Sequence, residues 1–276
     1  AASSYNTVVG FEALSAQQTY SGNTAIGYRA LKTTNGGYYN TAVGHDSLFS
    51  NTDGLYNVAT GHKAGEFATT ADSSTFIGHQ AGQGITGTKL TGYASLGSNT
   101  TAANNVAIGY TALSSDTKGY GSVAIGNATL ATQNFTSNTD TYNTAVGYNA
   151  GTAVTTGLSN TLIGAQSGDA ITDADYNCAV GAGTLSTNIL GSGSTAMGFN
   201  ALYNQNPVDG SSNPTAVSMY NTAYGYAAAS QVSTGIHNTC IGGVAGDALT
   251  IGRYNTTLGY LSLTTDIDGD FSTAIG

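Results

Sequence analysis

The sequence predicts an all-β fold, a parallel β-solenoid in which short coils stack along one axis. A five-residue phrase, clearest at 143–147 as Asn-Thr-Ala-Val-Gly, recurs along the whole chain and ends on a glycine at sixteen positions. Twelve of the fifteen intervals between these glycines are 17 residues long. A period this short indicates about sixteen stacked coils, because one unit cannot bury its own apolar face.

The closing glycine of each phrase serves as an anchor, and we number each coil from it as position 0. The phrase then covers positions −4 to 0, and the residues that follow take positive numbers. The anchors are Gly10, Gly27, Gly44, Gly61, Gly78, Gly92, Gly109, Gly126, Gly147, Gly164, Gly181, Gly198, Gly225, Gly242, Gly259 and Gly276.

The phrase itself is the predicted strand of each coil. Position −4 is Asn in eleven of sixteen copies, which suits a turn, and positions −3, −2 and −1 are mostly Thr, Ala and Val or Ile. Residues two apart share one face of a strand, so Thr and Val/Ile share one face and Ala and Gly the other. We predict that the β-branched residues form the core, which would contain Val9, Ile26, Val43, Ile125, Val146 and Ile163.

The remainder of each coil begins with an aromatic residue at position +1 in eight of fifteen copies, followed by Leu or Gly and then by Ser, Thr, Asn and Gly. This pattern predicts a second short strand and two turns per coil. Helix is excluded because the units are short, rich in glycine and β-branched. The small Ala and Gly side chains would let three copies pack side by side on that face as a homotrimer and bury more apolar area.

Three intervals depart from the period, at 14, 21 and 27 residues. The longer two predict excursion loops at 131–142 and 203–220 within a single repeat domain that spans 1–276, a segment of a longer fibre. Loops on one side of a solenoid often carry its binding function, although a tolerated surface insertion is the alternative. The candidate receptor-binding residues, which could hydrogen-bond to sugars and stack on their rings, are Tyr203, Asn204, Gln205, Asn206, Asp209, Asn213 and Tyr220.

Composition excludes several classes of partner. Charged residues make up 8% of the chain, and the net charge is −9. So acidic a surface repels a phosphate backbone, which argues against nucleic acid. No apolar run approaches the ~20 residues of a membrane span, so this segment is not expected to insert into a membrane.

Two groups of side chains could hold a metal ion. His45, His62 and His79 follow three successive anchors and predict either a metal-binding or pH-sensing column or simple stacking in place of the aromatic residues. Alternating carboxylates at 266–270 are typical of a calcium loop or of a solvated acidic turn. These acids are Asp266, Asp268 and Asp270. No other cofactor is predicted.

Two further features have structural interpretations. Position +2 alternates in charge over four coils, at Glu12, Arg29, Asp46 and Lys63, which predicts ion pairs between neighbouring coils. The two cysteines lie in different columns three coils apart, which argues against a disulfide and predicts two buried small residues. The sequence lacks both a Gly-Lys-Ser/Thr phosphate loop and a Gly-x-Ser-x-Gly elbow, so no enzyme is predicted.

The phrases at 105–109 and 121–126 resemble the Asn-Ser-Val-Ala-Ile-Gly repeat of YadA-like trimeric autotransporter heads. The longer phrase Asn-Thr-Ala-Val-Gly-Tyr-x-Ala-Leu is similar to repeats of phage tail-fibre proteins. This resemblance implies a left-handed parallel β-roll, three copies side by side, and a role as an adhesive stalk or head. The autotransporter repeat is shorter, and only the interval from Gly78 to Gly92 matches it.

The predicted function is therefore an extracellular fibre segment for adhesion or host attachment, on a virion as a tail fibre or on a bacterial surface. Its partners would be copies of itself and a host-surface glycan or receptor. A purely structural spacer is the alternative. An ice- or polymer-binding solenoid is a third class, suggested by the Thr column from Thr7 to Thr273, although that column is broken at Lys89 and Cys178 and is expected to share its face with the core.

Overall fold

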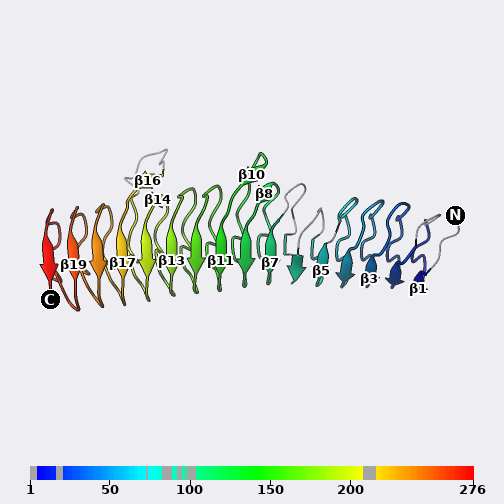
Figure 1. Ribbon diagram of the computed structural model, residues 1–276, viewed down its shortest axis with the longest axis horizontal. Coiled ribbons are helices and arrows are strands. Elements are labelled where there is room, and N and C mark those ends of the chain that lie inside the picture. Colours follow the sequence, from blue (N-terminus) through cyan, green and yellow to red (C-terminus); the bar gives the residue numbers. More distant parts are fainter. Residues whose placement is uncertain are drawn as a thin grey trace. The chain divides into compact units, whose positions relative to one another are not determined.

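The computed structural model describes residues 5–16, 21–72, 74–82, 89–91, 95–96, 98, 104–207 and 216–276. Within these residues the protein is all-β without a helix, and parallel stacked coils form a β-solenoid of about 14 turns (Figure 1). The predicted parallel β-solenoid is thus confirmed. The chain divides into two compact units, Ala1–Asp140 and Thr141–Gly276.

In the described part of the first unit, eight three-residue strands form a parallel sheet in chain order. Each residue pairs with the residue at the same position of the next coil, as Thr24 pairs with Thr41 and Ala25 with Ala42. A two-residue pair, β8 (Gly119–Tyr120) and β10 (Thr139–Asp140), stands apart from this sheet. The eight strands are β1 (Thr7–Val9), β2 (Thr24–Ile26), β3 (Thr41–Val43), β4 (Val58–Thr60), β5 (Thr75–Ile77), β6 (Lys89–Thr91), β7 (Val106–Ile108) and β9 (Val123–Ile125).

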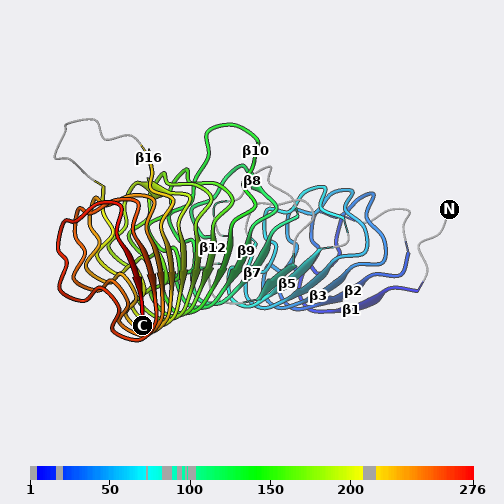
Figure 2. The same ribbon diagram turned by 60° about the vertical axis from the view of Figure 1, so that its left-hand side comes forward.

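The described part of the second unit repeats this plan with eight more parallel strands. Its separate two-residue pair consists of β14 (Gly191–Ser192) and β16 (Val217–Ser218). Figure 2 shows β10 on a loop that projects beyond the regular coils of its own unit. The eight strands are β11 (Thr144–Val146), β12 (Thr161–Ile163), β13 (Cys178–Val180), β15 (Thr195–Met197), β17 (Thr222–Tyr224), β18 (Thr239–Ile241), β19 (Thr256–Leu258) and β20 (Thr273–Ile275).

Most described coils contain one strand, and the second strand predicted directly after the anchor is wrong for the coils that the structure describes. The two-residue strands β8, β10, β14 and β16 come later in their coils, shortly before the next three-residue strand. Residues at positions +2 and +4 adopt left-handed backbone, as Arg29 (φ 53) and Leu31 (φ 52) do. Left-handed residues turn the chain and prevent an extended strand. These turns still stack through backbone hydrogen bonds between coils, for example from Leu31 N to Ser47 O at 3.0 Å.

The core is built from the opposite strand face to the one predicted. Between the first and last coils, the side chains at position −2 whose burial is described are fully buried, including Ala25, Ala145 and Leu162 at 0% exposure, whereas Val8 in the first coil is 45% exposed. The six predicted core residues lie outside instead: Val9 is 59% exposed and Ile163 38%, and Ile26, Val43, Ile125 and Val146 are also partly or largely exposed. The Val/Ile core is therefore wrong.

The narrow interior of a 17-residue coil explains this inversion. Fully buried leucines at position +4 fill the space beneath the strand. In most coils, therefore, only a small residue fits at position −2. These leucines are Leu31, Leu48, Leu96, Leu113, Leu130, Leu185 and Leu202. Because the Ala column is interior, it cannot contact another copy of the chain. The predicted packing of copies on an Ala–Gly face is thus also wrong.

The anchor glycines allow successive coils to approach closely. A Cβ placed on Gly147 would lie 2.5 Å from the carbonyl oxygen of Gly164, and its φ of +140° is rare for residues with a side chain. The same geometry recurs at Gly27, Gly44 and Gly126, which adopt φ between 135 and 139. At Gly27, Gly44 and Gly147 both the space and the backbone conformation require glycine, and at Gly126 the backbone conformation does.

Asparagines at position −4, predicted as turn residues, line the interior as a hydrogen-bonded column. Asn160 is fully buried; its Nδ2 donates to Ala174 O at 2.8 Å and its Oδ1 accepts from Asn177 N at 3.0 Å. Each amide thereby joins its own coil to the next. The buried members are Asn23, Asn40, Asn57, Asn105, Asn143, Asn160, Asn177, Asn221, Asn238 and Asn255.

Candidate binding surfaces

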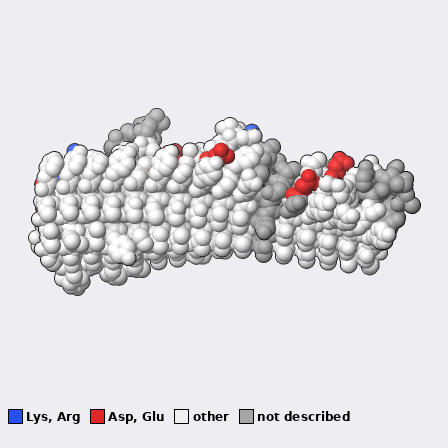
Figure 3. Space-filling view, in the orientation of Figure 1, with Lys and Arg blue, Asp and Glu red and all other residues white. Residues whose placement is uncertain are grey.

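The outward side chains at positions −3, −1 and +1 form one surface, which we call the outer face. In the second unit these positions hold no charged residue. Among the described residues visible in Figure 3, the charged side chains lie mainly toward the upper part of the view, and the lower part is uncharged. Large exposed side chains of the second unit's outer face are Tyr148, Ile163, Met197, Phe199, Tyr224, Tyr226, Ile241, Leu258, Tyr260 and Ile275.

The apolar area of this face is large for an isolated surface. Its five aromatic side chains are between 49% and 71% exposed. At about 150–250 Å² for a whole aromatic side chain, they alone present on the order of 500 Å². The largest apolar patch of a typical monomer is roughly 300–600 Å². With the aliphatic and threonine side chains added, the face approaches the ~800 Å² that one partner contributes to a standard interface.

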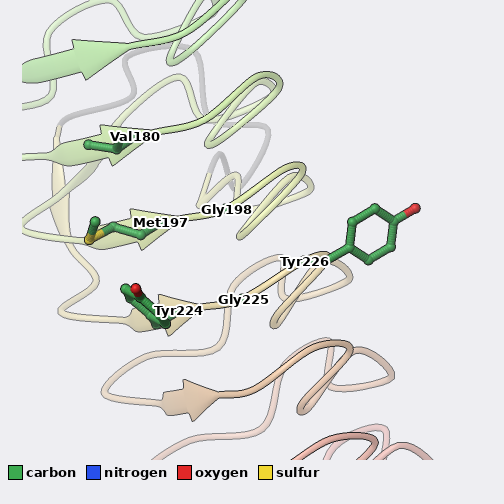
Figure 4. A pocket seen from close by; sticks show the side chains of 6 residues that line it. All are labelled: Val180, Met197, Gly198, Tyr224, Gly225 and Tyr226. Carbon is green, nitrogen blue, oxygen red and sulfur yellow. The ribbon is translucent and has the colours of Figure 1, made fainter.

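A shallow hollow of about 300 Å³ interrupts the outer face of the second unit (Figure 4). Val180, Met197 and Tyr224 occupy position −1 of three successive coils, and Tyr226 extends from the other side of Gly225. Met197 and Tyr224 replace the usual Val or Ile here. The hollow therefore makes this part of a repetitive face different from its neighbours.

Exposed aromatic rings stack from coil to coil at position +1. The ring centroids of Phe11 and Tyr28 are 5.7 Å apart, and those of Tyr28 and His45 are 4.8 Å apart. The histidine column continues this stack, with 5.1 Å from His45 to His62 and 4.9 Å from His62 to His79. The structure thus places the three histidine rings next to one another in one column, with His62 and His79 stacked and His45 tilted by 36° relative to His62.

A second aromatic column lies at position −5, just before the strands, and sequence analysis overlooked it. Tyr220, His237, Tyr254 and Phe271 stack in order at 5.3, 5.0 and 4.9 Å. Residues at this position have left-handed backbone, such as Tyr254 at φ 56. The period of the tyrosines in the sequence was the signal that could have revealed this column.

The residues predicted to bind a receptor do not form one site. Gln205 is fully buried, and its Oε1 accepts from Ser194 Oγ at 3.1 Å and Asn221 Nδ2 at 2.9 Å, so its predicted receptor contact is wrong. Ser194 occupies position −4 of this coil in place of the usual asparagine, and the longer side chain of Gln205 fills the space that the asparagine would take. Asn204 Nδ2 donates to Gln231 Oε1 at 2.9 Å.

Tyr203 and Tyr220 are 37% and 55% exposed, and Asn206 N donates to Ser233 O at 3.0 Å. Asp209 and Asn213 lie outside the described residues. Tyr220 lines a hollow of about 340 Å³ beside β16. Its other lining residues are Asp175, Tyr176, Ser192, Gly193, Ala216 and Ser218.

The +2 charge column pairs only in part as predicted. Arg29 makes a two-pronged contact with Asp46, with Nε and Nη2 at 2.8 and 2.7 Å from its carboxylate oxygens. Burial raises the pKa of Asp46, but the hydrogen bond from Arg29 and the nearby positive charges outweigh it, so the pKa is lowered. Glu12 pairs with Lys32 at 2.6 Å, and Lys63 pairs with Glu66 at 3.1 Å, instead of with their column neighbours.

The acidic turn at 266–270 uses its carboxylates for local bonds. Asp266 Oδ1 accepts from Gly269 N at 2.8 Å, and Asp270 Oδ1 accepts from Arg253 N in the preceding coil at 2.8 Å. Asp175 accepts from Leu158 N at 2.7 Å in the way that Asp270 does. Among the residues that the structure describes, no group of three or more His, Cys, Asp or Glu is arranged to hold a metal ion.

One buried carboxylate lies beneath β8 and β10 in the first unit. Asp116 is fully buried, and it accepts hydrogen bonds from Gly119 N at 3.0 Å and from Gln133 Nε2 at 3.2 Å. Burial raises the pKa of Asp116, and these hydrogen bonds offset only part of that rise. Gln133 also contacts Ser122 at 3.1 Å, so a serine and a glutamine again replace an asparagine in the interior column.

Within the described part of the chain, no helix has the length and apolarity needed to cross a membrane. A comparison with protein-family models and with curated proteins finds no match to this chain.

Proposed function

We propose that this chain is a self-associating segment of an extracellular adhesive fibre, on a virion or on a cell surface. The observation that carries the proposal is the outer face of the second unit, which is apolar, uncharged and exposed over eight coils. A face of this size favours a covering partner, because burying it would gain roughly 25 cal/mol per Å².

A second copy of the chain is the partner that fits this face best. Every coil presents the same positions at the strand spacing of ~4.8 Å, so an identical chain matches it over its whole length. The face also lacks charges that would select a different protein. In this proposal about sixteen coils wind left-handed, and three copies assemble through the outer face as a homotrimer.

The extracellular location and the adhesive role follow from composition and repetition. A regular rod suits stiffness and multivalent attachment, and the acidic chain would not bind nucleic acid. It would bind a host-surface glycan or receptor, without catalysis and without a required cofactor. A purely structural spacer needs the same coils and differs only in lacking the binding step.

Self-association is tested by two matched substitutions in the second unit. Ile241 lies on the outer face at 38% exposure, and Ile251 lies at position +9, away from it, at 49% exposure. Ile241→Lys should convert the wild-type oligomer to monomer in native mass spectrometry, whereas Ile251→Lys should leave it unchanged. A wild-type chain that is monomeric at micromolar concentration, or equal behaviour of the two variants, would contradict the proposal.

Ice- or polymer-binding is a second candidate, favoured by the outward orientation of the Thr column. Thr161, Thr195 and Thr239 alternate with fully buried residues and therefore do not share a face with the core. The same face cannot bind both a copy and a crystal surface. This candidate predicts a monomeric protein that concentrates in slowly grown ice, with Thr161→Lys weakening the effect; exclusion from ice would remove it.

A further inference from the structure

The hollow beside β16 belongs to positions −5 and −6 and to the loop that carries β16, and is separate from the outer face. We infer that this hollow binds one pyranose ring of a surface glycan, and that this ring carries no acidic group. The inference rests on the proposed adhesive function and gives it a ligand class.

Backbone pairing fixes the floor of the hollow. In the parallel pair β14–β16, Ser192 lies directly opposite Ser218. The pair is held by hydrogen bonds from Val217 N to Leu190 O at 2.8 Å and from Met219 N to Ser192 O at 2.9 Å, and Met219 is fully buried. Two hydroxyl groups thus sit on a rigid floor, where they can bond to neighbouring hydroxyls of a sugar.

One hydroxyl of this floor is already oriented. Ser192 Oγ accepts a hydrogen bond from Asp175 N at 2.9 Å, which leaves its own proton to donate. The carboxylate of Asp175 uses Oδ1 to accept from Leu158 N at 2.7 Å. That bond fixes the side chain, and its second oxygen remains as an acceptor for a sugar hydroxyl or ammonium group.

Two tyrosines border the hollow, and a glycine stands between them in the aromatic column. Tyr176 and Tyr220 are 68% and 55% exposed, and the intervening coil has Gly193 at the same position. Where that position holds a ring, as at His237, the column is filled by stacking. At Gly193 the ring of Tyr220 lies against the glycine instead, because a Cβ added to Gly193 would be 2.9 Å from Cδ1 and from Cε1 of Tyr220. Among the described residues, no ring stacks on Tyr176. Its apolar ring can therefore contact the C–H face of a pyranose.

Charge decides which sugars fit. Among the described residues that line the hollow, Asp175 is the one that carries a charge. Residues 141–276 contain a single cation, Arg253, and eight Asp residues. A sialic acid or a sulfated sugar would meet like charge with no cation to pair with it, which is unfavourable. Neutral pyranoses avoid this repulsion, and an amino sugar gains an ion pair with Asp175.

A glycan array of neutral, aminated and sialylated glycans, followed by calorimetry on the best neutral and aminated ligands, tests the inference. Wild-type protein should bind neutral and aminated glycans and reject sialylated ones. Tyr176→Ala should reduce affinity at least tenfold, whereas Tyr254→Ala, in the same column away from the hollow, should not. Asp175→Asn retains an acceptor for Leu158 N and should abolish the preference for aminated glycans. Circular dichroism should show all three variants folded.

Preferred binding of sialylated glycans, or equal affinities of Tyr176→Ala and Tyr254→Ala, would overturn the inference. If no glycan binds while the oligomer still attaches to cells, the hollow is not the receptor site and the fibre proposal stands. If Ile241→Lys leaves the oligomer intact, the fibre proposal fails independently of any glycan result.

Discussion

Removing one amide from the interior asparagine column should destabilise the second unit strongly. In Asn160→Ala, the carbonyl oxygen of Ala174 loses its donor at 2.8 Å and the N–H of Asn177 loses its acceptor at 3.0 Å. Asn143 Oδ1 loses its 3.3 Å contact but keeps the backbone donor Asn160 N at 2.9 Å. Two buried backbone groups therefore become unsatisfied.

Each unsatisfied buried group costs about 1–3 kcal/mol, so the substitution should cost roughly 2–6 kcal/mol. The second unit, Thr141–Gly276, spans 276 − 141 + 1 = 136 residues. At about 2.1 cal/mol/K per residue, its unfolding entropy is on the order of 0.3 kcal/mol/K. If the unit unfolds cooperatively, its midpoint temperature should therefore fall by roughly 7–20 °C.

Differential scanning calorimetry measures this shift directly. The control is Asn127→Ala, which removes an exposed asparagine and should change the midpoint by less than about 2 °C, as expected of a surface substitution. Hydrogen exchange should also show faster exchange at Asn177 N, the amide that lost its acceptor. An Asn160→Ala midpoint equal to that of Asn127→Ala would refute the view that this column holds the coils together.

Three further changes test other parts of the fold. Leu162→Ala should lower the free energy of unfolding, measured by chemical denaturation, by about 2–5 kcal/mol because that side chain is fully buried. Ile163→Ala, at a position that is 38% exposed, should lower it by less than half as much. The reverse order would support the predicted Val/Ile core. Gly164→Ala should lower the melting temperature by several degrees, since its Cβ would lie 2.5 Å from the next coil's carbonyl oxygen at a φ of +131°, and a neutral result would contradict the close approach of the coils. Because the folded-state pKa of Asp116 is raised, its stabilising contribution is complete below the ordinary value of 3.8 and is lost as pH rises through the raised pKa. The melting temperature of Asp116→Asn should therefore rise relative to that of wild type between pH 4 and pH 7, whereas that of Asp140→Asn, at an exposed position, should not. Parallel pH profiles of the two variants would show that Asp116 is not buried as described.

The sequence was sufficient to predict the coil and its parallel neighbours, because a fixed 17-residue period places equal positions side by side. It did not reveal which strand face points inward. Hydrophobicity favoured Ile163 over Ala145 as a core residue, but the small volume beneath the strand favours the smaller side chain there. That volume depends on the leucines at position +4, whose left-handed backbone is unusual for leucine and was not predictable from propensity.

The residues of the candidate sites, like the fold, were predictable from the sequence only in part. The loop at 203–220 was predicted from an interruption of the period, and Gln205 within it was interpreted as exposed because polar residues usually are, whereas the structure buries it. Its partner Ser194, a serine in an asparagine column, was the available signal for a buried glutamine. Asp175 and Tyr176 were missed because they come from a neighbouring coil, which only the structure places beside the loop.

The two cysteines offer the most direct test of the central claim, that positions −3 and −1 face outward and position −2 faces the core. Cys178 occupies position −3 and is partly exposed, contrary to its predicted burial, whereas Cys240 occupies position −2 and is fully buried. Burial also raises the pKa of the Cys240 thiol, which reduces its reactive thiolate form. Thiol labelling of folded protein, at a dilution where native mass spectrometry shows monomer, should modify Cys178 and spare Cys240 until the chain unfolds. Labelling of Cys240 as fast as Cys178 would contradict the assignment of the two faces.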